Sequence, residues 1–429
     1  MHGSIFCMKY EKKILKNGLR IISIPNKDSL AATILVLVEA GSKYEKKEIN
    51  GLSHFLEHMC FKGTTKRPRA IDISAELDSM GAQYNAFTGH EYTGYYAKVE
   101  ARHFDKALDV VADLYQNPLF NEQEIEKEKG VVVEEINMYE DLPQRKVQDL
   151  ITKLLYGDQP AGWSIAGEKE IVRGLKKSDF LKYRGEHYVA SATTVIVAGK
   201  FDEKNIYKKI EAKFKNVIQG KKFGKIKTAE IQTMPNILVN FKKSDQTHLV
   251  MAVRTHDTYD KRNYTLELLA HILGGSMSSR LFQRIREEMG AAYYVRAYND
   301  SFTDHGYLAI AVGVDNSRVL DVLGAILDEC KKIRDIKIEE KELQMFKDSM
   351  IGNTVLGMET SDAIASYYGA QEILRKPIEG PTEFARKILK VTAKDVMKEA
   401  ELIFRDDKLN LALIGPFDTD EHFAKILHI

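Results

Sequence analysis

Two histidines and a glutamate lie within about one helical turn near the start of the chain. They belong to the segment Leu52-Ser53-His54-Phe55-Leu56-Glu57-His58-Met59. Residues four apart on an α-helix project from one face, so His54 and His58 can hold the same metal ion while Glu57 stands beside it. The spacing His-x-x-Glu-His is a zinc protease signature, the reverse of His-Glu-x-x-His. The segment therefore predicts half of a zinc hydrolase site.

A third ligand has to come from elsewhere, because a catalytic zinc ion takes three protein ligands and keeps a fourth position open for water. Residues 121–141 predict a helix dense in carboxylates. Glu128 and Glu135 are seven residues apart in it and therefore share a face. The apolar run 130–133 between them indicates a segment that packs against a core. Spacing alone does not separate Glu135 from Glu134 as the ligand.

Length and composition bound the class of protein. A chain of 429 residues predicts two domains. Lys and Arg number 63 against 62 Asp and Glu, so charge does not favour nucleic acid or an anionic membrane as the main partner. The three cysteines, Cys7, Cys60 and Cys330, form no CxxC pair and suit a reducing compartment, so we expect the cytoplasm. The N-terminal apolar stretch is too short for a signal peptide, and no run approaches the roughly 20 apolar residues of a membrane span.

Hydrophobic periodicity places these residues on elements. Strands are predicted over 21–25, 32–38 and 92–99, and helices from about Gly51 and over 70–79. The basic segment 220–235 contains Gly and Pro and lacks a clear period, which predicts a linker. We therefore expect an N-terminal domain over 1–219 and a C-terminal domain over 236–429.

The second half of the sequence echoes the first. Five short matches occur in the same order at offsets between 209 and 217 residues. They contain the pairs Tyr44 and Tyr259, His54 and His271, Met80 and Met289, Phe87 and Phe302, and Asp109 and Asp321. Self-similarity of this kind predicts two copies of one α+β unit, each an antiparallel-rich mixed sheet packed with helices. The second copy has Gly274 and Gly275 where the first has Glu57 and His58, so only the first is expected to bind metal in this way.

The segment from His54 to His58, followed by Glu135 77 positions later, resembles the inverted zinc motif of the pitrilysin, insulin-degrading enzyme and mitochondrial processing peptidase family, M16. The resemblance covers essentially the whole chain, with the length of the two-domain processing-peptidase-like branch. It implies that Glu135 is the third zinc ligand, that Glu128 supports the site, and that each chain binds one Zn²⁺. The expected activity is zinc-dependent endopeptidase cleavage of unfolded peptides, with Glu57 as the general base for a zinc-activated water.

The resemblance also implies substrate contacts in both halves. Residues 81–93 resemble the family's edge strand beside the zinc, where Asn85, Ala86 and Phe87 would contact a peptide added as an extra β-strand. Arg286 and Tyr293 have the spacing of the family's pair that approaches the scissile carbonyl from the non-zinc domain, where they would serve catalysis and substrate binding. Gly274 to Ser279 resembles the family's glycine-containing loop, although it is shorter and less glycine-rich. Family enzymes with four such domains close around the substrate, so a two-domain chain predicts a homodimer with a composite active site.

Two other functions compete with this one. The first is a noncatalytic partner or scaffold subunit, which typically loses a ligand or the base. The second is an iron oxygenase with two histidines and one carboxylate, whose ligands usually lie on barrel strands.

Several other residues are expected to serve structure or solvation. Cys60 is expected to be a buried free thiol, and Glu134 and Glu140 to be solvated. A role in structure or solvation, and not in metal binding, is also expected of His90, His103, His187 and His256. Tyr293 as a core residue and Arg286 as a surface charge remain alternatives.

Overall fold

Two compact units make up the fold, described here by a computed structural model covering residues 9–429. Cys7 and the N-terminal stretch considered for a signal peptide lie outside the described residues. Unit 1 contains the chain up to Ile136, Ser164–Ile226 and Val355–Thr382. Unit 2 contains Asn137–Trp163, Lys227–Thr354 and Glu383–Ile429. The packing units therefore differ from the predicted boundaries 1–219, 220–235 and 236–429, because each half of the chain gives a segment to the unit built mainly by the other half.

A six-stranded mixed sheet forms the centre of unit 1. Its strands are β1 (Glu11–Ile14), β2 (Arg20–Pro25), β3 (Ala31–Val38), β4 (Gln83–Thr88), β5 (Thr93–Glu100) and β6 (Thr193–Gly199). Their order is β1-β2-β6-β3-β5-β4, and only the β2 and β6 pair is parallel. Strand β4 therefore lies at an edge of the sheet, beside β5.

Unit 2 repeats this topology with five strands. They are β7 (Asn236–Phe241), β8 (Gln246–Thr255), β9 (Ala292–Ser301), β10 (Gly306–Asp315) and β11 (Asn410–Gly415), in the order β7-β11-β8-β10-β9. Again one pair is parallel, β7 with β11, and the others are antiparallel. The predicted α+β fold of two duplicated units is confirmed.

Two glycines show the repeat at the level of the backbone. Gly81 precedes β4 with φ +62°, and Gly290 precedes β9 with φ +58°. Both belong to the Met-Gly-Ala match found in the sequence. A side chain is disfavoured in this left-handed region, so glycine is the residue that lets each chain turn into its edge strand.

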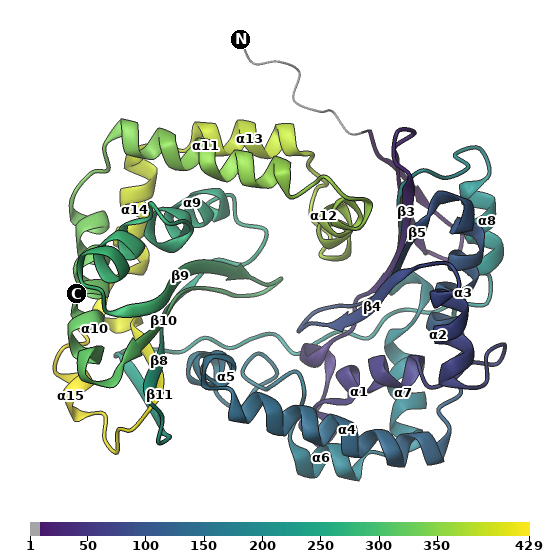
Figure 1. Ribbon diagram of the computed structural model, residues 1–429, viewed down its shortest axis with the longest axis horizontal. Coiled ribbons are helices and arrows are strands. Elements are labelled where there is room, and N and C mark those ends of the chain that lie inside the picture. The colour runs from purple at the N-terminus through teal and green to yellow at the C-terminus, as the bar shows by residue number, and fades with distance from the viewer. Residues whose placement is uncertain (1–8) are drawn as a thin grey trace. The chain divides into compact units, whose positions relative to one another are not determined.

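Helices cover both faces of each sheet. In unit 1, α1 (Leu52–Cys60), α3 (Phe104–Gln116) and α7 (Lys177–His187) pack on one face, and α12 (Ser361–Ile373) packs on the other against β3 and β6 (Figure 1). In unit 2, α9 (Asn263–Gly274), α10 (Val319–Asp335) and α14 (Ala393–Ile403) cover one face, and α5 (Pro143–Tyr156) covers the other. Burial on both faces explains why strands such as 195–198 are apolar at consecutive positions.

Helices α5 and α12 occupy equivalent places in the two copies. Strand β5 is followed by α3, α4 (Glu122–Asp141) and α5, and strand β10 by α10, α11 (Glu340–Leu356) and α12. Each of α5 and α12 is encoded in one half of the sequence and packs on the sheet of the other half. The remaining helices are α2 (Ala70–Asp78), α6 (Lys169–Gly174), α8 (Ile206–Lys213), α13 (Pro381–Lys390) and α15 (Glu421–Ala424).

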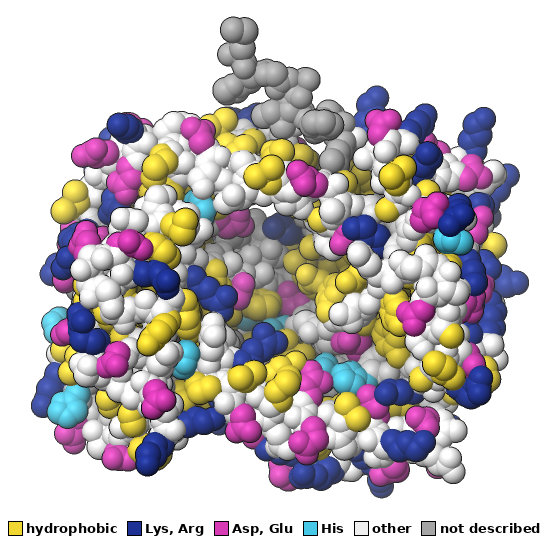
Figure 2. Space-filling view, in the orientation of Figure 1, with side chains coloured by type: hydrophobic (Ala, Val, Ile, Leu, Met, Phe, Trp, Pro, Cys, Tyr) yellow, Lys and Arg dark blue, Asp and Glu magenta, His cyan; other side chains and the backbone are white. Residues whose placement is uncertain are grey.

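The surface carries charges of both signs. Figure 2 shows Lys and Arg side chains interspersed with Asp and Glu over the visible face, as the net charge of +1 leads one to expect. Within residues 9–429, every helix is too short or too polar to meet the requirements of a membrane span.

Candidate metal centre

Helix α1 presents its two histidines on the face opposite its core contacts. Leu52, Phe55, Leu56 and Met59 are buried in the core of unit 1. The histidines fall between these apolar positions, and their ring centroids lie 4.7 Å apart. The 3.6-residue period of the helix thus separates a packing face from a chemical face.

Helix α4 supplies the carboxylates. Nε2 of His54 lies 3.6 Å from Oε2 of Glu135, and Nε2 of His58 lies 3.4 Å from the same oxygen. Among the described residues, this trio is the one group of His, Cys, Asp or Glu side chains whose ligand atoms converge closely enough to hold an ion. The structure therefore separates Glu135 from Glu134, which is exposed on the same helix.

The two separations between a histidine and Glu135 fit a tetrahedral zinc ion. Ligand atoms about 2.1 Å from such an ion lie about 3.4 Å from one another, which matches both separations. Two imidazoles and one carboxylate also form a donor set of catalytic rather than structural type, with one position left for water or substrate.

Glu128 orients His58 from behind. Its Oε1 lies 2.9 Å from Nδ1 of His58, and its Oε2 lies 2.6 Å from Nζ of Lys62. An ionised carboxylate can only accept, so Nδ1 carries a hydrogen and Nε2 is the ring nitrogen that faces Glu135. Burial alone would lower the pKa of His58, but its bonds to Glu128 and Glu135 outweigh that effect and raise the pKa to about 9 in the metal-free protein. Metal binding therefore has to displace a proton from His58.

Glu57 stands beside the trio without joining it. Its Oε2 accepts a hydrogen bond of 2.5 Å from Oγ1 of Thr88, at the end of β4. Burial raises the pKa of Glu57, and the Thr88 bond opposes this without cancelling it. A carboxylate with a raised pKa is a stronger base than an exposed one, which suits proton abstraction near neutral pH.

Strand β4 runs along the edge of the sheet next to α1, as expected for the segment 81–93. Its residues alternate in facing, so Thr88 reaches Glu57 while Asn85 and Phe87 point to the other face. The Phe87 ring lies over Gly94, where a Cβ would come within 2.4 Å of Cζ. Glycine at this position is therefore what allows the ring to lie flat on β5.

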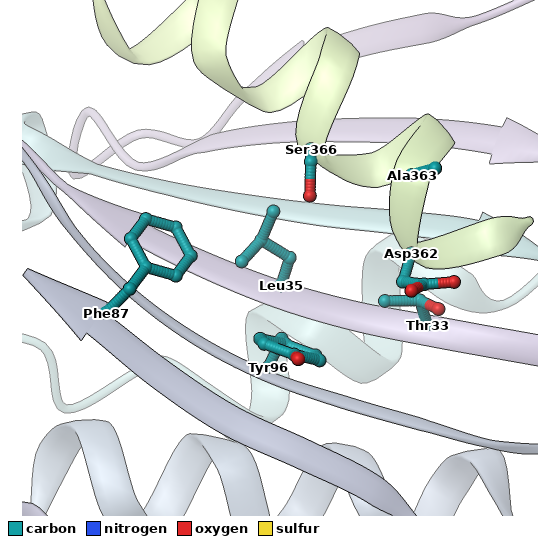
Figure 3. A pocket seen from close by; sticks show the side chains of 7 residues that line it. All are labelled: Thr33, Leu35, Phe87, Tyr96, Asp362, Ala363 and Ser366. Atoms are coloured by element: carbon teal, nitrogen blue, oxygen red, sulfur yellow. The ribbon is translucent and has the colours of Figure 1, made fainter. Parts of the chain in front are cut away.

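A cavity of about 220 Å³ lies next to Phe87, between the sheet and α12. Figure 3 shows Phe87, Leu35 and Tyr96 along one part of it, and Thr33, Asp362 and Ser366 along the rest. Phe87 is the residue of the edge strand β4 that lines this cavity.

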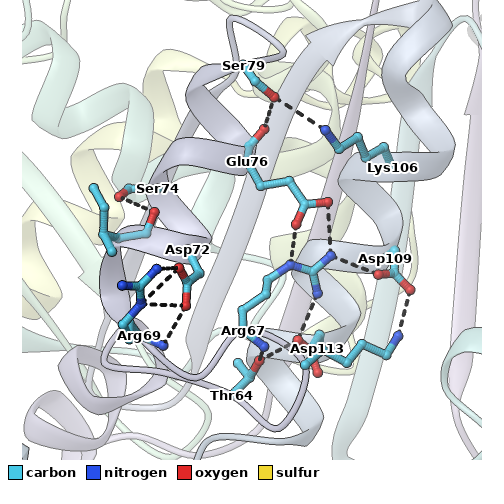
Figure 4. A network of polar contacts seen from close by, with 12 residues as sticks. Thr64, Arg67, Arg69, Asp72, Ser74, Glu76, Ser79, Lys106, Asp109 and Asp113 are labelled. Atoms are coloured by element: carbon cyan, nitrogen blue, oxygen red, sulfur yellow. Dashed lines mark hydrogen bonds and ion pairs between the residues drawn. The ribbon is translucent and has the colours of Figure 1, made fainter.

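An ionic network fixes the loop that follows α1. Arg67 is buried and bonds to Glu76, Asp109 and Asp113, drawing together the loop, α2 and α3 (Figure 4). Thr64 in the same loop donates to Oδ2 of Asp113 at 2.5 Å. Nothing in the spacing of these residues revealed the network, because its members are brought together by tertiary packing.

The equivalent helix in unit 2 carries no such cluster. His271 on α9 is buried, and its Nε2 lies 3.1 Å from Oγ of Ser349 on α11. A Cβ built on Gly275, the position of His58, would fall 2.2 Å from Nδ1 of His271. A second ligand side chain therefore has no room there, which gives the predicted loss of metal binding a steric cause.

Arg286 and Tyr293 are both exposed in unit 2, which removes the alternative that Tyr293 is a core residue. Arg286 lies on a π-helix, Phe282–Glu288, and its Nη1 donates to the backbone oxygen of Tyr293. This bond holds the Arg286 side chain against the backbone of Tyr293.

The residues expected to have background roles behave accordingly. Cys60 is a fully buried free thiol, and Glu134 and Glu140 are exposed. Within the described chain, His90, His103, His187 and His256 belong to no cluster able to hold a metal. Sequence spacing predicts no role for Thr88 or Lys62, since their contacts with Glu57 and Glu128 depend on the fold.

Fold and site together define a duplicated α+β protein with an inverted zinc motif on its first unit, and comparison with known proteins agrees. Residues 20–169 match the family described as Insulinase (Peptidase family M16), and residues 174–350 match the Peptidase M16 inactive domain. The chain belongs to peptidase family M16.

Its relatives are named as zinc proteases. "Uncharacterized zinc protease YmxG" of Bacillus subtilis is 37% identical over 94% of this chain and 97% of its own length. An "Uncharacterized zinc protease" of Rickettsia felis is 36% identical over 94% and 97%. A protease from Helicobacter pylori shares the fold, with a TM-score of 0.88 at 20% identity, covering 96% of this chain and 100% of the other.

Proposed function

We propose that this chain is a zinc-dependent endopeptidase that hydrolyses unfolded peptides or extended protein segments. The observation that carries the proposal is the convergence of His54, His58 and Glu135 on one point, with the Glu57 carboxylate beside them. A zinc ion, one per chain, would polarise the scissile carbonyl and lower the pKa of water when bound.

The chain's own residues account for the remaining steps. Thr88 holds one oxygen of Glu57, and among the described residues nothing bonds to the other, Oε1, which can take a proton from water and return it to the leaving amine. The free edge of β4 offers backbone groups to a peptide that adds as a strand, and Asn85, Ala86 and Phe87 would line it. Such a mode selects extended chains because a folded protein has few unpaired strands to offer.

The experiment compares wild type with Glu57→Gln on a peptide library, with products identified by mass spectrometry and bound metal measured on the same samples. We expect one zinc per chain in both proteins and a loss of cleavage of about 10²- to 10⁴-fold in the variant. Glu140→Gln, an exposed change on α4, serves as the control and should cleave normally. Unchanged cleavage in Glu57→Gln would refute the mechanism, while wild type without metal or activity would favour the scaffold alternative.

We further propose a homodimer in which Arg286 and Tyr293 of one subunit serve the metal centre of the other. Its support is that the pair is exposed and held together, as a surface for substrate requires. Mixing Glu57→Gln with Tyr293→Phe, each inactive alone, should restore activity after subunit exchange, and mixtures that stay inactive would argue against a shared site. The free thiols Cys60 and Cys330 support a cytoplasmic location, which fractionation of the source cells would test.

A further inference from the structure

A buried carboxylate lies at the start of α1, and none of the proposed catalytic steps uses it. Glu45 is only 2% exposed. Its Oε1 accepts a hydrogen bond from the backbone N of Ser53 at 2.6 Å, and its Oε2 accepts one from Gly51 N at 2.8 Å and another from Asn50 Nδ2 at 2.9 Å. Three donors from the first residues of the metal-binding helix thus converge on one side chain.

This arrangement differs from an ordinary helix cap. The N-cap residue is Gly51, with φ +96°, and it has no side chain to offer. A Cβ there would meet the backbone oxygen of Ala166 at 2.6 Å, so a Ser, Thr or Asp cap is excluded at this position. Glu45 supplies the acceptors from outside the helix, and brings a full charge with them. All three of its hydrogen-bond donors are neutral.

A buried carboxylate without a cation is costly, so its presence calls for a compensating interaction. Here that interaction is the positive end of the α1 dipole, together with the unpaired N–H groups of the first turn. Burial raises the pKa of Glu45 to about 7, and the bonds from Ser53, Gly51 and Asn50 act in the opposite direction. The group is therefore best studied at pH 8, above this pKa.

The contacts of Glu45 lead directly to a metal ligand. Ser53 precedes His54, and its backbone N is held by Glu45 while its Oγ donates to Tyr183 Oη at 2.7 Å. Asn50, which also bonds to Glu45, donates to the backbone oxygen of Ser164 at 3.1 Å. The first turn of α1, just before His54, is thereby held by contacts of both Asn50 and Ser53.

We infer that Glu45 is a positioning residue for the metal centre: its carboxylate sets the place and orientation of the first turn of α1, and with it the imidazole of His54. The inference rests on the proposed function only in requiring that the trio binds metal. It assigns to Glu45 a role in metal affinity and geometry, beyond general stability.

The test uses the full-length protein at pH 8 with Glu45→Gln and Glu45→Asp. Gln keeps the size of the side chain but turns an amide NH₂ toward donors, and Asp keeps the charge but is one methylene too short to reach both backbone N–H groups. Glu399→Gln is the matched control, because Glu399 is a buried carboxylate in unit 2 that bonds to His256. Zinc affinity is measured by chelator competition, and the ligand geometry by the visible absorption of the cobalt-substituted protein.

We expect Glu45→Gln to lower zinc affinity by about 10- to 100-fold, the usual effect of losing support behind a ligand, and to change the cobalt spectrum. Glu45→Asp should change the zinc affinity and the cobalt spectrum in the same direction but by a smaller amount. If Glu45→Gln fails to fold, the result for Glu45→Asp tests the inference. The control should match wild type in both measurements. Folded Glu45 variants with wild-type affinity and spectrum would overturn the inference alone, whereas wild type that binds no zinc would overturn the proposed function and the inference together.

Discussion

At the scale of single residues, the candidate metal centre depends on its expected ligands and also on the side chains that hydrogen-bond to them and fix their orientation. His54 and His58 share a helix face by spacing alone, but the orientation of the His58 ring is fixed by Glu128. The same carboxylate also pairs with Lys62, so it is itself held in place. The position of the His58 ring is therefore determined from a second helix, α4.

We predict that Glu128→Gln lowers zinc affinity by about 10- to 100-fold, because the amide can present a donor to Nδ1 and no longer fixes the ring's tautomer. Chelator competition at pH 8 measures the change. Glu134→Gln, on the exposed side of the same helix, should leave affinity unaltered. Equal affinities for wild type and Glu128→Gln would show that His58 needs no support.

A second prediction concerns acid stability and His187. Burial lowers the pKa of His187 from its ordinary 6.5 to about 4, and its ring packs 4.4 Å from that of Tyr183. The unfolded chain therefore takes up a proton between pH 6.5 and 4 that the folded chain resists, so stability is full above pH 6.5 and falls as the pH drops toward 4. Taken over the full shift, this contribution is at most about 3 kcal/mol.

Replacing His187 with Phe keeps a ring and removes the titration. We expect the free energy of unfolding of His187→Phe to fall less steeply than that of wild type between pH 6.5 and 4. Urea unfolding at several pH values gives both slopes, and their difference isolates His187 from other titrating groups. Parallel slopes would mean that the folded protein accommodates the charged ring.

At the scale of elements, α1 is secured at both ends. Glu45 binds its N-terminal N–H groups, and the Arg67 network ties down the loop that follows its C-terminus. The core contacts of Phe55 and Leu56 hold its middle. A helix of only nine residues is marginal by itself, so these tertiary contacts are what keep the two histidines in place.

The network makes a testable contribution to the stability of the protein. Arg67→Met should cost about 3–5 kcal/mol in the free energy of unfolding, because Asp113 would be left buried without its cation. Urea denaturation measures the loss. Arg69→Met is the matched control, since Arg69 pairs with Asp72 in the same region but is exposed and should matter little. Similar losses in the two variants would show that burial of the network has no special effect.

At the scale of the whole molecule, the two copies exchange one helix each. One face of the unit 1 sheet, with Ile22, Leu35 and Ile196, is covered by Ile364, Tyr368 and Ile373 of α12. Removing a buried side chain of this kind typically costs about 2–5 kcal/mol. Losing all three, about 6–15 kcal/mol, is therefore comparable to the whole stability of a domain, about 5–15 kcal/mol. A half-chain therefore lacks a cover that its own sheet requires.

We predict that residues 1–226 and 227–429 are each insoluble or unfolded when produced separately, and form a soluble one-to-one complex when produced together. Each fragment would supply the helix that covers the other's sheet. Size-exclusion chromatography and circular dichroism follow the outcome. A fragment of 1–226 that unfolds cooperatively near the temperature of the full chain would contradict the exchange.

The sequence by itself determined the repeat, the fold class and the motif, because these depend on local periodicity and on spacing along one helix. His54 and His58 share a face wherever the helix lies, and Gly81 marks the turn into β4 through its backbone alone. Spacing alone does not distinguish Glu135 from Glu134 as the ligand. The packing of α4 does, because it turns Glu135 toward the two histidines and leaves Glu134 exposed.

Only the tertiary structure decided which distant groups support the site and which sheet each helix covers. Glu45 and Thr88 are unremarkable in sequence, and become important because folding brings them to α1 and Glu57. Helix α5 packs on the unit 2 sheet and α12 on the unit 1 sheet, and the apolar pattern of a helix does not specify which sheet it covers. Such choices depend on long-range packing energies summed over many contacts, and no local pattern of residues records them.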